Sequence, residues 1–197
     1  MRYFLLRMRP TAETRILDVG GYPGNWDDPK VDADITLLNI HPIDLSSRPS
    51  NYRMNAVVGD GCHLPYEDGA FDIVFSNSVI EHVGGWDRQM AFAAEMMRVG
   101  RALWIQTPAR SFFVEPHLLT PFIHYFPRSI QRRLLRRFTI WGMITKPTPE
   151  QVETFLNEVR LLTEDEMNEL FPDCQVLHER IAGLTKSFIA IRDAHRA

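Results

Sequence analysis

Five short, nearly continuous apolar runs constrain the fold of this chain more than any other feature. They lie at Arg15–Val19, Ile35–Ile40, Asn55–Val58, Asp72–Phe75 and Ala102–Gln106. Strands buried on both faces of a parallel sheet have this pattern, whereas strands with one solvent-exposed face alternate apolar and polar residues. A helical repeat from Trp86 to Met97, followed by Gly100 as a C-cap, leads into the fifth run. The sequence therefore predicts helices and parallel strands in one α/β fold.

The second half of the chain adds helices first and strands last. Thr148 and Thr163 each begin a capping-box pattern, which predicts two further helices. Two strand-like runs follow, Gln175–Ile181 and Ser187–Ile191, with Gly183 in the turn between them. The expected fold is thus α/β, Rossmann-like and doubly wound, with a mostly parallel sheet and a late antiparallel hairpin.

The length of the chain favours a single domain, and the sequence indicates one inserted segment within it. A chain of 197 residues can bury a single sizeable core, so we expect one domain over residues 1–197. The alternation of predicted strands and helices is interrupted at residues 108–146, which contain prolines, aromatic residues and a cluster of arginines. Because this segment leaves the end of the fifth strand, we interpret it as a substrate-side insertion or lid within the domain.

Composition and charge exclude several classes of protein. Apolar residues make up 45% and charged residues 24%, as in an ordinary globular protein, and the net charge of -3 argues against nucleic acid as a partner. Cys62 and Cys174 are too few for a disulfide framework, and no Cys/His cluster has the spacing of a zinc site, so no metal is expected. No signal-peptide pattern or bilayer-spanning run is present, which predicts a cytoplasmic protein.

The strongest candidate for a binding site is the stretch ILDVGGYPGNW, residues 16–26, at the end of the first predicted strand. Its glycines allow a sharp turn and a close approach of the backbone to a ligand. A second stretch, residues 59–83, places Asp60 after one strand and Ser76 at the end of the next. In a parallel sheet these carboxyl ends open on the same edge, where ligands bind.

The two stretches, with VIEHV in the second, resemble class I S-adenosylmethionine-dependent methyltransferases, of the small-molecule, type-11-like kind, over about residues 15–108. The resemblance implies that S-adenosylmethionine is the cofactor. It also implies an enzyme that methylates a small-molecule or lipid-linked acceptor, in our interpretation on oxygen. The implied cofactor-binding residues are Asp18, Gly20, Gly21, Gly24, Asn39, Asp60, Gly61, Cys62, Ser76 and Asn77.

Two positions depart from the family's pattern. Tyr22, followed by Pro23, replaces the central glycine of the turn, so the loop takes a less common path. Asn39 replaces the acid that ends the second strand and accepts the ribose hydroxyls. Because an amide oxygen is a weaker acceptor than a carboxylate, we expect Asn39→Asp to tighten cofactor binding.

A methyl group on a sulfonium is already activated, so the protein has mainly to align a nucleophile and exclude water. A hydroxyl nucleophile also benefits from a general base. Glu115 and His117 lie in a short polar stretch within an apolar part of the insertion. His117 is therefore the first candidate for the base, with Glu115 orienting it. His82, within the family-like stretch, is the second candidate.

Arginines and apolar residues alternate at helical spacing over Arg128–Arg137. This basic amphipathic pattern is typical of helices at anionic membrane surfaces, and a solvated helix face is the alternative. The first interpretation predicts a peripheral association with the inner face of a membrane. It also leaves an alternative function open, in which the chain is a non-catalytic methyltransferase-fold protein for interaction or membrane docking.

Overall fold

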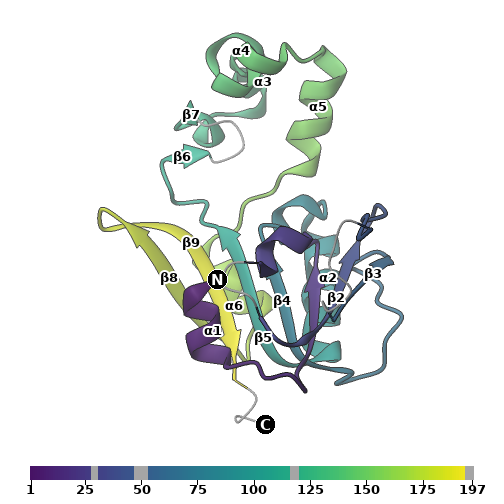
Figure 1. The fold of residues 1–197 in the computed structure, drawn as a ribbon. Helices are drawn as coiled ribbons and strands as arrows, with labels where there is room; N and C mark the ends of the chain where they lie inside the picture. The colour runs from purple at the N-terminus through teal and green to yellow at the C-terminus, as the bar shows by residue number, and fades with distance from the viewer. Residues whose placement is uncertain (28–30, 47–52, 116–119, 194–197) are drawn as a thin grey trace.

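A single seven-stranded sheet forms the centre of the molecule (Figure 1). The computed structural model describes residues 1–27, 31–46, 53–115 and 120–193. The strands of the sheet are β1 (Arg15–Val19), β2 (Asp34–Asn39), β3 (Met54–Val58), β4 (Phe71–Asn77), β5 (Gly100–Pro108), β8 (Gln175–Ile181) and β9 (Leu184–Arg192). Their order is β3-β2-β1-β4-β5-β9-β8; the first five are parallel, and β9 and β8 are antiparallel. The predicted Rossmann-like sheet with a late antiparallel hairpin is confirmed.

The near-continuous apolar pattern of the central strands has the expected cause. Ile16 and Leu17 are neighbours in β1, both are fully buried, and they belong to hydrophobic clusters on opposite faces of the sheet. On one face Phe92 and Met167 contribute side chains from α2 (Trp86–Val99) and α6 (Glu164–Leu170). On the other face Phe4 of α1 (Arg2–Met8) is buried in the cluster. Each face is therefore covered by a helix, as a parallel sheet requires.

Among its described residues, the first crossover contains a short 3-10 turn, η1 (Pro23–Trp26). Its tryptophan is fully buried and makes edge contacts with Phe4 and Phe75, at ring-centroid distances of 5.8 Å and 5.4 Å. One large aromatic side chain thus covers sheet surface beside α1 and supports the glycine turn from its far side.

The described residues between 111 and 158 form an arm that stands above the carboxyl edge of the sheet (Figure 1). It contains β6 (Val114–Glu115), β7 (Thr120–Pro121), η3 (Ile123–Tyr125), α3 (Arg128–Phe138), α4 (Ile140–Thr145) and α5 (Pro149–Glu158). The arm has a small core of its own, in which Leu135 of α3 packs with Val152 and Leu156 of α5. We expected an insertion at residues 108–146; the arm overlaps that range and also includes α5.

Candidate functional site

The carboxyl ends of β1, β2 and β3 and the loop after β4 surround a cleft of about 390 Å³, here called the glycine cleft. Several residues that we predicted as site residues line it: Gly20, Asn39, Asp60, Gly61 and His82. The lining also includes Tyr22, which we noted only as a departure in the glycine turn. Sequence reasoning missed the other lining residues Ile40, His41, Ser78 and Arg88. The topology brings all of them to one edge because parallel strands end on the same side of the sheet.

The glycine turn follows β1 directly. Gly20 has a φ of +74°, a conformation that favours glycine, and its amide donates to the Leu38 carbonyl at 2.7 Å. A Cβ on Gly21 would lie 1.7 Å from the Asp18 Oδ2, so any larger residue there would collide with that carboxyl group. The turn is therefore fixed from below by Asp18.

Asp18 is fully buried, and it is not among the residues that line the glycine cleft. The Trp26 Nε1 donates a hydrogen bond of 2.8 Å to its Oδ2, while its Oδ1 has no partner among the described residues. Burial raises the pKa of Asp18 to about 7, and the hydrogen bond from Trp26 opposes this rise only in part. The side chain stabilises the turn by packing beneath it.

The remaining predicted cofactor residues are not among those that line the cleft. Ser76 is buried, and its Oγ donates to the Val19 carbonyl at 3.0 Å, which ties β4 to the start of the turn. The Cys62 thiol donates to the Arg88 carbonyl at 3.3 Å, and burial raises the pKa of this thiol to about 11. Gly24 in η1 and Asn77 at the end of β4 are exposed.

Asn39 uses its amide to hold the turn against the end of β2. Its Nδ2 donates to the Gly21 carbonyl at 3.3 Å, and its Oδ1 accepts from the Ile40 amide at 3.1 Å. An aspartate at this position lacks the donor for the first of these bonds. The amide is thus part of the local backbone structure as well as of the cleft lining.

Asp60 carries a fixed negative charge at the rim of the cleft. Its Oδ1 accepts from the Cys62 amide at 2.9 Å, and the Arg88 Nη2 lies 3.1 Å from Oδ1 and 2.9 Å from Oδ2. The hydrogen bond from Cys62, and then the one from Arg88, lower the pKa of Asp60. Arg88 also donates from Nε to the Val83 carbonyl at 2.7 Å, so it links the two sides of the cleft.

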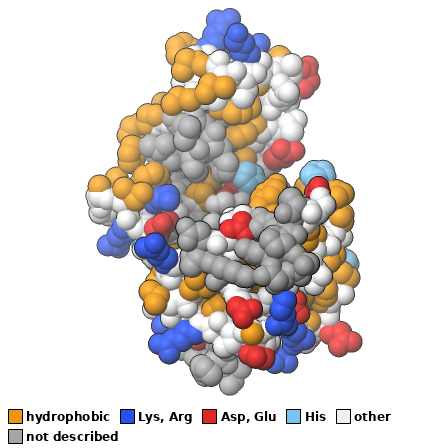
Figure 2. Space-filling view, viewed as in Figure 1, with side chains coloured by type: hydrophobic (Ala, Val, Ile, Leu, Met, Phe, Trp, Pro, Cys, Tyr) orange, Lys and Arg blue, Asp and Glu red, His pale blue; other side chains and the backbone are white. Residues whose placement is uncertain are grey.

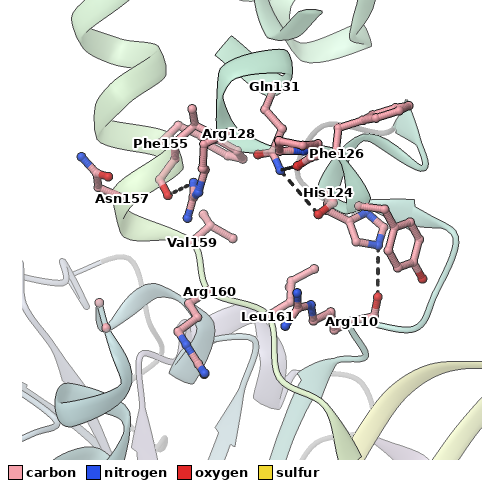
Figure 3. A pocket seen from close by; sticks show the side chains of 15 residues that line it. Arg110, His124, Phe126, Arg128, Gln131, Phe155, Asn157, Val159, Arg160 and Leu161 are labelled. Atoms are coloured by element: carbon pink, nitrogen blue, oxygen red, sulfur yellow. Dashed lines mark hydrogen bonds between the residues drawn. The ribbon is translucent and has the colours of Figure 1, made fainter.

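A second and larger pocket, of about 600 Å³, lies where the arm meets the sheet (Figure 3). We call it the arginine pocket, because Arg110, Arg128 and Arg160 line it and no aspartate or glutamate is among its lining residues. Aromatic side chains of Tyr125, Phe126 and Phe155 complete much of the wall. Figure 3 shows Arg128 beside the end of α5, with Arg110 and Arg160 on the side toward the sheet.

The arginines of this pocket differ in how they are held. Arg160 donates to Gln89 at 2.6 Å, pairs with Glu166 and lies 4.9 Å from the Trp86 ring centroid, so its position is fixed. Arg128 donates from Nη1 to the carbonyl of Leu156 in the last turn of α5. The side chain of Arg110 is exposed, and no described residue pairs with its guanidinium.

One short loop separates the glycine cleft from the arginine pocket. It begins with η2 (Ile80–His82), which follows β4. His82 and Val83 line the glycine cleft, and the next two residues, Gly84 and Gly85, line the arginine pocket. A ligand in either space therefore contacts the same loop.

The base candidates of the insertion are placed only in part. Glu115 pairs with Thr120 across the β6–β7 hairpin. His117 lies outside the residues that the structure describes, so its role stays a prediction. His124, on η3, lines the arginine pocket, and its Nε2 donates to the Arg110 carbonyl at 3.1 Å.

Residues 17–102 match the family model of a methyltransferase domain. An uncharacterized methyltransferase of Mycolicibacterium gilvum is 31% identical over 96 residues, which are 46% of this chain and 36% of that protein. The chain thus spans about a third of the length of this curated relative. Solved structures that share the fold include two of low sequence identity to this chain.

The first is a putative methyltransferase of Haloferax volcanii in complex with the Trm112 methyltransferase activator. Its TM-score is 0.60 and its identity 14%, with 98% of this chain and 88% of that chain covered. The second is an S-adenosylmethionine-dependent methyltransferase of Methanosarcina mazei. Its TM-score is 0.53 and its identity 16%, with 92% of each chain covered.

Proposed function

We propose that this chain is a class I S-adenosylmethionine-dependent methyltransferase and that it methylates an acceptor held in the arginine pocket. The match of residues 17–102 to a methyltransferase domain and the similarity to a curated methyltransferase support the first part of this proposal. The cofactor of this family is S-adenosylmethionine, and the glycine cleft is the site that we assign to it. The observation that carries the proposal is the loop of residues 82–85, which lines the cleft with its first half and the pocket with its second.

The residues of the glycine cleft fit the cofactor. Its volume of about 390 Å³ lies in the range of small-molecule sites, roughly 300–1,000 Å³. Asp60 offers a carboxylate to an amine donor, Asn39 offers an amide oxygen to a hydroxyl, and Gly20 brings the backbone close to the ligand. When bound, the cofactor supplies a methyl group that is already activated on a positively charged sulfur.

The protein then has to align the acceptor and remove its proton. With the cofactor bound, the acceptor atom would take the methyl group, and the electron pair of the broken carbon–sulfur bond would remain with the cofactor. For transfer to oxygen, which we propose, the hydroxyl proton passes to a base. His82 is one candidate, since it lines the glycine cleft as the first residue of that loop, and His117 with Glu115 is the other.

The surface of the arm supports a lipid-linked acceptor or a docking function. Arg133, Arg136 and Arg137 are exposed on α3, and basic side chains gather at the far end of the arm beside hydrophobic ones (Figure 2). Phe138 and Ile144 are 67% and 76% exposed. This combination suits the surface of an anionic membrane. None of the described helices is long and apolar enough to cross a bilayer.

Calorimetry with S-adenosylhomocysteine tests the cofactor assignment. We expect Asp60→Ala to weaken binding by about 5-fold to 150-fold, because it removes a charged acceptor. Glu67→Ala is the matched control, since Glu67 is an exposed carboxylate nearby in sequence and outside the cleft. Equal affinities of the wild type and Asp60→Ala would overturn the assignment.

Transfer of a labelled methyl group to extracts of small molecules and lipids tests catalysis. Cofactor binding without any transfer would favour the non-catalytic docking function instead.

A further inference from the structure

We propose that the arginine pocket binds a phosphate group of the methyl acceptor through the guanidinium groups of Arg128 and Arg110. The inference rests on the proposed function in naming the acceptor's class, which is a phosphate monoester with an aromatic or other apolar body. The phosphate chemistry of the pocket itself stands on the residues that line it.

Arg128 is held in place and still has donors to offer. One of its five N–H groups is used on the Leu156 carbonyl. Desolvation, and then the charge of Arg132, lower the pKa of Arg128. The nearby Glu153 is paired with Arg132, with an Nη2 to Oε2 distance of 2.9 Å. The positive charge of Arg128 is therefore incompletely compensated, and an anion in the pocket would compensate it.

Arg110 supplies the second cation from the sheet side. Its backbone is fixed, because its amide donates to the Leu162 carbonyl at 2.9 Å and its carbonyl accepts from His124. Among the described residues no carboxylate pairs with Arg110 or Arg128. Two cations from different elements thus border one pocket whose lining residues contain no acid. A guanidinium fork matches the geometry of phosphate oxygens.

The start of α3 adds to the positive potential. Pro127 and Arg128 line the pocket, and the first turn of α3 contains neither a capping side chain nor an acidic residue. The positive end of this eleven-residue helix therefore borders the pocket without internal compensation. This contribution supports the arginines and would not suffice without them.

The rest of the wall indicates what the phosphate is attached to. Tyr125, Phe126 and Phe155 line the same pocket, so an apolar or aromatic body has surface to pack against. Arg160, fixed by Gln89 and Glu166, closes the side toward α2. An acceptor of this kind would have its anionic end between Arg128 and Arg110 and its reactive end toward the loop of residues 82–85.

Titration with phenyl phosphate, followed by NMR or calorimetry, tests the proposal. We expect phenyl phosphate to bind at least about tenfold more tightly than phenol or benzoate, which lack the phosphate. Arg128→Gln and Arg110→Gln should each weaken this binding by about tenfold or more, and Arg128→Lys should restore part of it. The control is Arg133→Gln, which removes an exposed charge of the same helix outside the pocket and should leave affinity unchanged.

Three results would overturn the proposal: phenyl phosphate binding no tighter than phenol, benzoate binding equally well, or Arg133→Gln weakening binding as much as Arg128→Gln. The Arg110 guanidinium makes no hydrogen bond or ion pair with the described residues, so the result for Arg110→Gln does not depend on refolding of the arm. S-adenosylhomocysteine affinity, measured on the same variants, should be unchanged. If the wild-type protein does not bind S-adenosylhomocysteine, the cofactor assignment is refuted. The proposal that the arginine pocket binds phosphate is not affected by that result.

Vesicles of phosphatidylcholine and phosphatidic acid distinguish the two sources of a phosphate monoester. If the natural group is a lipid headgroup, these vesicles displace phenyl phosphate from the wild-type protein. If it belongs to a soluble ester, phenyl phosphate stays bound. Either result supports the pocket's phosphate chemistry and identifies its source.

Discussion

The buried carboxyl group of Asp18 makes stability depend on pH in a direction opposite to that of most paired carboxylates. Its pKa is raised from 3.8 to about 7 by burial beneath the glycine turn. For an acid with a raised pKa, the folded state binds the proton more tightly than the unfolded state. The contribution of Asp18 to stability is therefore greatest below about pH 4, falls as the pH rises, and is constant again above about pH 7.

The size of the effect follows from the shift. A rise of the pKa from 3.8 to about 7 corresponds to about 4 kcal/mol of free energy. Ionising Asp18 in the folded protein thus costs at most about 4 kcal/mol, which is a large part of the 5–15 kcal/mol that typically stabilises a domain. Asp18→Asn keeps an oxygen to accept from Trp26 and removes the charge. We expect the stability difference, variant minus wild type, to rise by up to about 4 kcal/mol between pH 4 and pH 8.

Urea unfolding at a series of pH values measures this difference directly. Subtracting the wild-type curve removes the titration of all other groups, which the two proteins share. Glu67→Gln provides the control, because an exposed carboxylate should give a difference that is flat with pH. Parallel curves for Asp18→Asn and the wild type would refute the claim that burial of this carboxyl group costs free energy.

Three further predictions concern the cleft, the base and the arm. Asn39→Asp should tighten S-adenosylhomocysteine binding by calorimetry through a charged acceptor. The same substitution should lower the free energy of unfolding by about 1 kcal/mol, because the hydrogen bond to the Gly21 carbonyl is lost. Weaker binding of S-adenosylhomocysteine would mean that the amide is needed as a donor. His117→Ala should lower turnover on an identified acceptor by about 100-fold to 10,000-fold with unchanged S-adenosylhomocysteine affinity, and loss in His82→Ala alone would assign the base to His82. Replacing Arg133, Arg136 and Arg137 by Gln should abolish flotation with acidic vesicles, since each basic residue near such a surface contributes about 1 kcal/mol; undiminished flotation would exclude the arm as the docking surface.

The fold was predictable because strands buried on both faces have a strong sequence signal. The run at Arg15–Val19 was predicted with the boundaries of β1, and the capping boxes at Thr148 and Thr163 begin α5 and α6 as expected. The extent of the arm was harder to predict. Its boundary depends on Leu135 of α3 packing against α5, and a contact between two amphipathic helices leaves no local pattern in the sequence.

The site was predictable where it follows strand ends and unpredictable where it depends on neighbours distant in the sequence. Gly20, Asn39 and Asp60 each follow from the end of a parallel strand, and all line the cleft. Arg88 crosses the cleft from the first turn of α2, where an arginine is usually a solvated residue. The arginine pocket was missed for the same reason, since Arg110 and Arg160 are far apart in sequence and meet only because the arm folds back.

The hydrogen bonds that shape the glycine cleft still leave acceptor capacity for a ligand. A carboxylate has about four lone-pair positions, and Asp60 uses two on Oδ1, for Cys62 and Arg88, and one on Oδ2, for Arg88. One position on Oδ2 remains, so an amine can bind without displacing Arg88. The amide oxygen of Asn39 likewise has two positions and uses one, for Ile40. Each side chain therefore fixes the local backbone and keeps one acceptor site, which allows the cleft to be formed before the ligand arrives.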